Sequence, residues 1–149
     1  MRAVVQRVRQ AGVTVDGQTV GRIEAGLLVY LGVAQDDAGD DAAFMAEKVA
    51  GLRIFPDAED RMNLDVSQAG GQVLVVSAFT VQADARKGRR PTFETAAQPE
   101  PARVLYELFC AALAGRGLTV ERGTFRAMME VHSVNAGPVC ILLDSKKVF

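Results

Sequence analysis

A Gly-Pro pair, Gly137-Pro138, interrupts the apolar stretch over residues 131–143, which would otherwise be predicted as one β-strand. Proline cannot donate a hydrogen bond to a central β-ladder, and glycine weakens a strand interior. X-Pro peptides also have ready access to the cis form, which reverses the direction of the preceding carbonyl. The pair therefore predicts a tight, exposed bend whose main chain acts as a recognition element.

Length and composition are those of one ordinary globular domain. The chain has 149 residues, enough to bury a hydrophobic core, and 49% of them are hydrophobic while 23% are charged. We therefore predict a single domain over residues 1–149. The formal net charge is -1, so the bulk electrostatics do not indicate a nucleic-acid binder. A nucleic-acid site on this chain has to come from a local cluster of basic residues.

The sequence favours a reducing compartment and no membrane contact. Its 2 cysteines, Cys110 and Cys140, are too few for a disulfide framework and match no metal-ligand spacing. Charged residues stand near the N-terminus where a signal peptide has its apolar core, and apolar runs such as residues 27–33 are too short to span a bilayer. We expect a cytoplasmic protein.

Strand patterns fill both ends of the chain. Residues 4–15 contain many valines and few helix formers, and Asp16-Gly17 is a strong signal for a two-residue hairpin turn into a return strand. Residues 26–33 lack polar alternation and are predicted as a central strand buried on both faces. Other predicted strands cover residues 19–23, 73–76 with a continuation to 81, 119–120, 128–134 and 139–143.

Two segments have helical periodicity. Met45, Val49 and Leu52 form one apolar stripe that follows N-cap candidates within residues 36–41. A second helix is predicted from a proline at 99 or 101 to residue 114. Helices and strands do not alternate strictly, which argues against a doubly wound parallel sheet. We predict an α/β fold with a mainly antiparallel or mixed, barrel-like β-sheet and two longer helices.

Hydroxyl side chains follow the predicted strand at residues 73–76. Ser77 and Thr80 stand at the end of a buried strand, a common position for active-site residues, but a serine or threonine nucleophile needs a nearby base. We interpret the only histidine, His132, as structural. No carboxylate pair indicates general acid–base chemistry, and Asp84 is assigned to turn formation.

A basic run comes next in the sequence. It consists of Arg86, Lys87, Arg89 and Arg90. Such a loop can contact RNA phosphates through arginine forks and the lysine charge. The alternative, a solvated charged loop, stays open because charge clusters are common on protein surfaces.

Cys140 follows the Gly-Pro pair closely, but a nucleophilic thiol needs a cation or a helix N-terminus to lower its pKa. Its apolar neighbours favour a structural role, and Cys110 is predicted to lie in the core. No glycine-rich phosphate loop and no His/Cys cluster is present, so we expect neither a cofactor nor a metal. An enzyme on this chain would have few ordinary catalytic side chains.

Several collinear segments together resemble the D-aminoacyl-tRNA deacylase family, also known as the D-tyrosyl-tRNA deacylase family. Two motifs, Ser77-Ala78-Phe79-Thr80 and Asn135-Ala136-Gly137-Pro138-Val139, make the resemblance specific because the basic run stands between them. The other segments are residues 1–8, 52–55, 62–64 and 86–91, together with Phe93. The resemblance covers essentially the whole chain.

The resemblance implies a homodimer that hydrolyses the ester joining a D-amino acid to the 3′ end of tRNA, and that also removes glycine from mischarged tRNA-Ala. Gly137 and Pro138 would form a cis peptide that projects from one subunit into the active site of the other and excludes L-amino acids. Arg7 would buttress this peptide, and Asn135 belongs to the same motif.

The resemblance also implies how catalysis proceeds. Ser77, Ala78, Phe79 and Thr80 would form the pocket floor, with the backbone N–H groups of Phe79 and Thr80 as oxyanion donors. The 2′-hydroxyl of the terminal ribose would help to activate the attacking water, so that the protein mainly positions and filters.

The chain departs from the family pattern at Ala78, where glutamine is usual, and at Cys140, where threonine is usual. Two other hypotheses therefore stay open. One is a paralogue that binds the tRNA 3′ end without efficient catalysis, and the other, ranked last, is a hydrolase that uses the Cys140 thiol.

Overall fold

Strand β1 (Arg2–Val15) organises the sheet. In the computed structural model, which describes residues 1–149, one edge of β1 pairs with β3 (Gly26–Gly32) and then with β2 (Gln18–Ile23). Its other edge pairs with β8 (Glu130–Asp144), and all three pairings are antiparallel. The turn at Asp16-Gly17 has φ values of 50° and 76°, so the predicted hairpin is confirmed.

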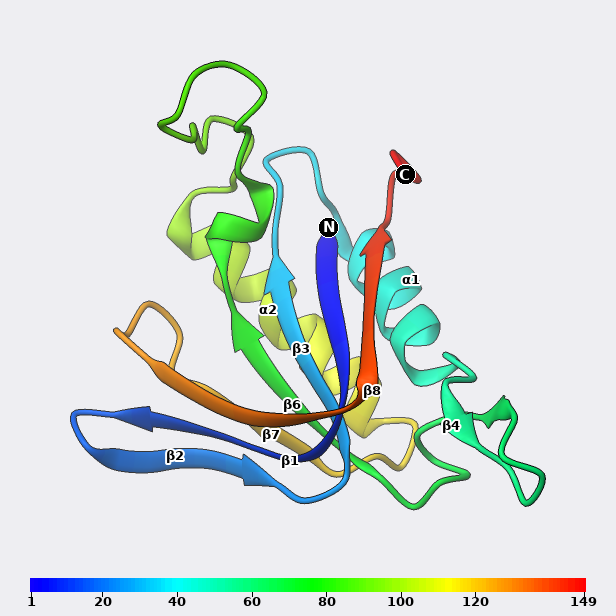
Figure 1. Cartoon of the computed structure of the whole chain (residues 1–149). Coiled ribbons are helices and arrows are strands. Elements are labelled where there is room, and N and C mark those ends of the chain that lie inside the picture. The colour runs from blue at the N-terminus through cyan, green and yellow to red at the C-terminus, as the bar shows by residue number, and fades with distance from the viewer.

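The rest of the sheet is parallel and almost closes on itself (Figure 1). Strand β6 (Gln72–Ser77) pairs with β3, and β7 (Val120–Arg122) pairs with β6. Strand β2 then approaches β7 so closely that a Cβ on Gly21 would lie 2.4 Å from the carbonyl oxygen of Arg122. This nearly closed mixed barrel confirms the predicted fold class.

Helices α1 (Gly39–Ala50) and α2 (Pro99–Ala114) pack against each other behind the sheet in Figure 1. They supply the crossovers that the two parallel strand pairs need. Met45 of α1 and Phe109 of α2 are fully buried in the same core as Val29 of the sheet. Neither helix is long and apolar enough to cross a membrane. A small antiparallel pair, β4 (Phe55–Pro56) with β5 (Met62–Leu64), lies outside the barrel.

The predicted strand continuation beyond Ser77 is wrong. Strand β6 ends at Ser77, and residues 79–82 form the 3₁₀ helix η1 (Phe79–Gln82). The buried amide of Gln82 donates from Nε2 to the carbonyl oxygen of Gly32 at 2.9 Å. Gly32 makes this packing possible, because a Cβ there would lie 3.0 Å from the carbonyl oxygen of Ala78. These contacts across the sheet turn the chain away from the strand direction.

The two strands predicted at residues 128–134 and 139–143 are one strand, β8, with a bulge in its middle. Asn135 pairs with Val8 of β1 and Cys140 pairs with Gln6, so residues 136–139 have no partners in this ladder. Since β1 continues through the whole length, it holds both halves of β8 in one ladder. Residues 136–139 therefore bulge from the sheet, and the predicted bend is confirmed.

Candidate functional site

The bulge of β8 presents main chain to solvent. Gly137 and Pro138 are both exposed, and the peptide between them is cis. Asn135 closes the base of the bulge, since its Nδ2 donates to the carbonyl oxygen of Val139 at 3.0 Å and its Oδ1 accepts from the Val139 N–H at 2.7 Å. One side chain thus satisfies both backbone groups of Val139, which has no partner in the ladder with β1.

Arg7 of β1 supports the same bulge through a hydrogen bond. Its Nε donates to the carbonyl oxygen of Ala136 at 2.9 Å, and its Nη1 donates to the carbonyl oxygen of Ile54 at 2.5 Å. Gly137 has φ of +138°, and a Cβ there would lie 2.9 Å from Val139 Cγ2 and 3.1 Å from Arg7 Nη2. Only glycine fits this position without displacing the arginine.

The second candidate segment begins where β6 ends. Ser77 is paired with Leu31 of β3, and the N–H of Ala78 donates to the carbonyl oxygen of Leu31 at 2.9 Å. The first bond of η1 runs from the N–H of Val81 to the carbonyl oxygen of Ala78. The N–H groups of Phe79 and Thr80 precede that bond and have no partner inside η1. They are donors that an incoming oxygen can use.

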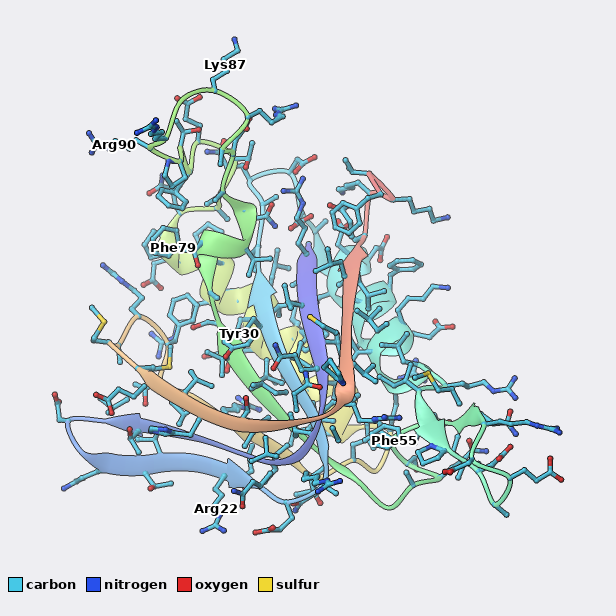
Figure 2. All side chains as sticks on the ribbon, viewed as in Figure 1. Arg22, Tyr30, Phe55, Phe79, Lys87 and Arg90 are labelled. Atoms are coloured by element: carbon cyan, nitrogen blue, oxygen red, sulfur yellow. The ribbon has the colours of Figure 1, made fainter.

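The loop after η1 carries the basic run on a narrow neck. Asp84 and Thr92 exchange two backbone hydrogen bonds of 2.9 Å, which hold residues 85–91 as a protruding loop. Figure 2 shows Lys87 and Arg90 pointing outward from it. Hydrogen bonds from Arg86 lower the pKa of Asp84 to about 2, and Arg86 is thereby held at the neck, as the assignment of Asp84 to the turn anticipates.

The two segments do not meet within one chain. Figure 1 shows the bulge at the corner of β8 near the lower end of α1, whereas η1 lies beyond the opposite end of β6. Arg7 and Asn135 therefore lie with Gly137-Pro138 in one group of candidate residues. The basic loop lies with the segment from Ser77 to Thr80 in a second, separate group.

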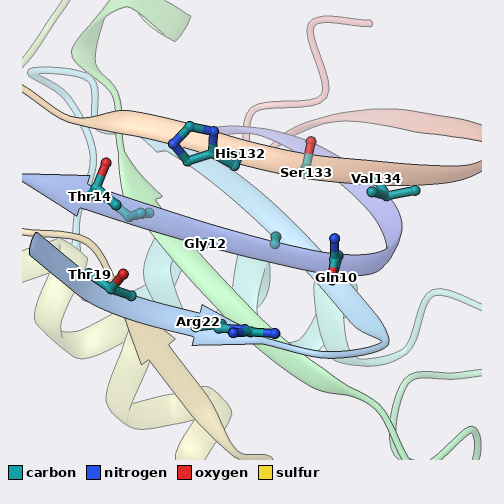
Figure 3. A pocket seen from close by; sticks show the side chains of 10 residues that line it. Gln10, Gly12, Thr14, Thr19, Arg22, His132, Ser133 and Val134 are labelled. Carbon is teal, nitrogen blue, oxygen red and sulfur yellow. The ribbon is translucent and has the colours of Figure 1, made fainter. Parts of the chain in front are cut away.

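The remaining reactive side chains lie apart from both groups of candidate residues. His132 is exposed at a hollow of about 340 Å³, opposite Thr19 and Arg22 of β2 (Figure 3). It is no base for Ser77 or Thr80. No group of three or more His, Cys, Asp or Glu side chains is arranged to hold a metal ion.

The cysteines have opposite environments. Cys110 is fully buried, as predicted, and burial raises the pKa of its thiol to about 11. Cys140 is exposed, although its apolar neighbours in the sequence favoured a structural role. The reason is strand alternation: Val139 points to the helix side of the sheet, and Cys140 points to the face that no helix covers.

Comparison with known proteins assigns this arrangement to a family. The family model described as D-Tyr-tRNA(Tyr) deacylase matches residues 4–144. The chain belongs to the D-aminoacyl-tRNA deacylase family, a family of hydrolases. A D-aminoacyl-tRNA deacylase of Koribacter versatilis is 59% identical, and one of Thermotoga petrophila is 55% identical, each over 100% of both chains.

Solved structures share the fold of this deacylase family member. The c-Myc DNA unwinding element binding protein aligns with a TM-score of 0.91 at 36% identity, over 97% of this chain and 98% of the other. A probable eukaryotic D-amino acid tRNA deacylase aligns with a TM-score of 0.81 at 17% identity, over 95% and 97%. The second likeness concerns the fold alone.

Two supports of the segment from Ser77 to Thr80 were not predictable from the sequence. Gln82 anchors η1 to β3, and Phe93 packs its ring edge to face on Phe79, with centroids 5.0 Å apart. A glutamine within a presumed strand carried no signal of burial. Phe93 was available only as part of the family resemblance, since a lone aromatic after a basic loop predicts no partner.

Proposed function

We propose that this protein hydrolyses the ester of D-aminoacyl-tRNA and releases the free D-amino acid and tRNA. The observation that carries the proposal is the exposed Gly137-Pro138 bulge, which Arg7 and Asn135 hold through the hydrogen bonds described above. A main-chain element fixed so firmly suits a rigid steric filter. Membership of the deacylase family supplies the substrate class.

In the proposed reaction, water attacks the ester carbonyl carbon at the segment from Ser77 to Thr80. The N–H groups of Phe79 and Thr80 donate to the oxyanion that forms on the carbonyl oxygen. The ribose oxygen then leaves and takes up the proton that the water has lost, which makes it a hydroxyl, while the attacking oxygen stays with the amino acid as part of its carboxyl group. The neighbouring ribose 2′-hydroxyl orients and helps to deprotonate the water. This division of labour agrees with the absence of a histidine beside Ser77.

The site selects the D configuration by sterically excluding the side chains of L-amino acids. With the amino group and ester held in place, the side chain of an L-amino acid would point at the carbonyls of the Gly137-Pro138 bulge, and that of a D-amino acid would point away. Glycine has no side chain to exclude, so tRNA-Ala that is mischarged with glycine is a second substrate. The filter rejects L side chains without requiring D ones.

The filter acts on a partner subunit. One row of facing residues, Leu142, Val4, Tyr30 and Val76, crosses four neighbouring strands on the sheet face opposite the helices. Leu142 is 58% exposed, so the row is apolar and open at its β8 end. A second copy of the chain on this face would cover Leu142 and bring its own bulge to the segment at Ser77. The homodimer would thus complete the site.

The substrate's phosphates would meet the basic loop. Lys87, Arg89 and Arg90 are exposed, and Arg86 holds the loop neck. These cations form a local cluster on a chain of near-zero net charge, which gives the RNA a defined approach. The protein would act in the cytoplasm, where aminoacylated tRNA is used.

The decisive experiment compares D-tyrosyl-tRNA with L-tyrosyl-tRNA as substrates of the wild-type protein. We expect rapid release of D-tyrosine and retention of the L ester. The alternative, a paralogue that binds the tRNA 3′ end without efficient catalysis, has the replaced residues Ala78 and Cys140 in its favour. It predicts retention of both esters with undiminished binding of the tRNA, and that result would reject the hydrolase.

A further inference from the structure

The hollow of about 340 Å³ lies on the outer surface of the sheet, where β2, β1 and β8 run side by side. Gly12 of β1 is paired with Arg22 on one side and with His132 on the other, so the three residues form one row across the strands. Figure 3 shows Arg22 and His132 on opposite sides of Gly12. Ala11 and Val13 are buried in the core beneath, and the row therefore points outward.

The missing side chain of Gly12 makes the hollow. Apart from its neighbours in the chain, a Cβ built on Gly12 meets only the carbonyl oxygen of Gly21, at 3.6 Å, which is an ordinary van der Waals contact. Two strand spacings put the backbones of Arg22 and His132 about 10 Å apart, with no side chain between them. Packing therefore does not require a glycine here, and the space is open to a ligand.

The lining of the hollow is rich in hydrogen-bond donors and contains no carboxylate. Besides Arg22 and His132 it includes the polar side chains of Gln10, Thr14, Thr19 and Ser133. Glu24 lies 3.1 Å from Arg22 and Glu130 lies 4.0 Å from His132, but neither glutamate lines the hollow. All four side chains of these pairs are at least 64% exposed, so the pairs are weak and both donors can turn to an anion.

We propose that this hollow binds a backbone phosphate of the acceptor stem of the substrate, between the Arg22 guanidinium and the His132 ring. The inference rests on the proposed function, because an ester held at the Gly137-Pro138 bulge brings the RNA to this part of β8. His132 and Gly137 are separated by at most about 17 Å of extended strand. At about 3.4 Å per stacked nucleotide, the hollow is roughly five nucleotides from the ester. The phosphate therefore belongs to the first base pairs of the stem.

The proposed homodimer leaves the hollow open. Val76, at the buried end of the apolar row that contains Leu142, lies in the same core cluster as Val13. Arg22 and His132 point away from that cluster, so the hollow and the apolar row lie on opposite faces of the sheet. At each composite site one subunit would supply the basic loop, and its partner would supply the bulge and the hollow. The two subunits would thus contact the same RNA.

The test uses two D-tyrosyl esters. One is carried by a minihelix that contains the acceptor stem, and the other by the 3′-terminal CCA trinucleotide, which is too short to reach the hollow. For Arg22→Gln we expect the ratio of kcat/KM on the minihelix to kcat/KM on the short ester to fall roughly tenfold, the equivalent of one hydrogen bond to a charged group. The slope of log kcat/KM against log salt concentration on the minihelix should decrease by about 1. An unchanged ratio and slope would overturn the phosphate site.

Two further variants separate phosphate binding from general charge and from support of the fold. Arg61→Gln is the matched control, because Arg61 is also exposed and paired with a glutamate two residues away, Glu59, at 2.8 Å. It should leave the ratio and the slope unchanged, and an equal loss in this variant would overturn the site in favour of non-specific attraction.

Gly12→Val fills the hollow without changing any charge, and it should lower the ratio as Arg22→Gln does. Equal losses on both esters would assign Gly12 to the fold and overturn the site. A dimer that dissociates in Gly12→Val would assign the hollow to a subunit contact and overturn it as well. If this variant fails to fold, Arg22→Gln at its exposed position still decides the question.

The experiment distinguishes failure of this inference from failure of the proposed hydrolase. If wild type releases D-tyrosine and Arg22→Gln keeps the wild-type ratio, the phosphate site is rejected and the hydrolase stands. If wild type releases no D-tyrosine from either ester, the hydrolase is rejected, and binding of the uncharged minihelix still tests the site. Roughly tenfold weaker binding by Arg22→Gln than by Arg61→Gln supports it, and equal binding rejects it.

Discussion

The Nε of Arg7 donates to the carbonyl oxygen of Ala136 at 2.9 Å, so that a side chain of the first strand holds the bulge of the last one. The same guanidinium reaches Ile54 through Nη1. The planar fork of arginine satisfies both carbonyls at once, and a lysine ammonium cannot reproduce that geometry. The bulge of β8 is thus fixed by a residue far from it in the sequence.

We expect Arg7→Lys to relax chiral selection more than it slows the reaction. The bulge would lose one of its two fixed carbonyl contacts and become mobile, so L-tyrosyl-tRNA would begin to be cleaved. We expect the ratio of D to L deacylation rates to fall about tenfold, the equivalent of one hydrogen bond to a charged group. An unchanged ratio in a folded variant would show that Arg7 does not maintain the filter.

Gly137→Ala should impair both the filter and the fold. Its Cβ would lie 3.1 Å from Arg7 Nη2 in a backbone conformation with φ of +138°. The strain should lower the free energy of unfolding by about 1–3 kcal/mol, measurable by urea denaturation. Gly39→Ala is the matched control, because a Cβ there meets nothing within 4 Å. Equal stability of the two variants would contradict the reasoning.

Cys140→Ala should leave D-tyrosine release within about twofold of wild type. The thiol is exposed on β8, where Cys140 pairs with Gln6, and His132 lies on the other side of the bulge. Nothing in the structure therefore activates the thiol as a nucleophile. Abolished activity, or inactivation of wild type by iodoacetamide but not of Cys140→Ala, would favour the thiol hydrolase.

Replacing the terminal ribose 2′-hydroxyl of the substrate by hydrogen should abolish turnover. The reason is that the segment from Ser77 to Thr80 offers backbone donors but no neighbouring histidine base. Binding of the modified RNA should be nearly unchanged, since the phosphates and the base are intact. Single-turnover rates with D-tyrosyl-tRNA and its 2′-deoxy form measure the difference. Equal rates would require a protein side chain as the base.

Stability should respond to acid through Asp41. Burial raises the pKa of this carboxyl, but hydrogen bonds from the Ala38 N–H, Ser145 and Lys146 outweigh it and lower the pKa from 3.8 to about 2. A folded pKa below the unfolded one contributes stability above pH 3.8, and that contribution is lost as the pH falls through about 2.

Asp41→Asn should therefore cost about 1 kcal/mol near neutral pH and progressively less in acid. Thermal melts of both proteins between pH 2 and 7 measure the difference in Tm. Asp40→Asn, the neighbouring carboxylate in the first turn of α1, is the control and should show a smaller pH dependence. A difference in Tm that is constant with pH would reject the assignment.

Local patterns in the sequence were enough for the elements with strong signals. The preference of Asp16-Gly17 for positive φ, the apolar stripe around Met45 and the proline at the start of α2 each act over a few residues, so the hairpin and both helices were predictable. The segment after Ser77 was not, because its 3₁₀ turn depends on Gln82 reaching Gly32 across the sheet. Propensity cannot encode a partner so distant in the sequence.

The break in the strand at Gly137-Pro138 and the exposure of its main chain follow from the amino-acid sequence, since the missing N–H and the missing side chain are properties of those residues. The position and the rigidity of the bulge depend on contacts with distant segments of the chain. Pairing with β1 kept both halves of β8 in one ladder, Asn135 and Arg7 fixed the bulge, and the fold placed it away from Ser77. These are long-range contacts, and they exist only once the strands have come together.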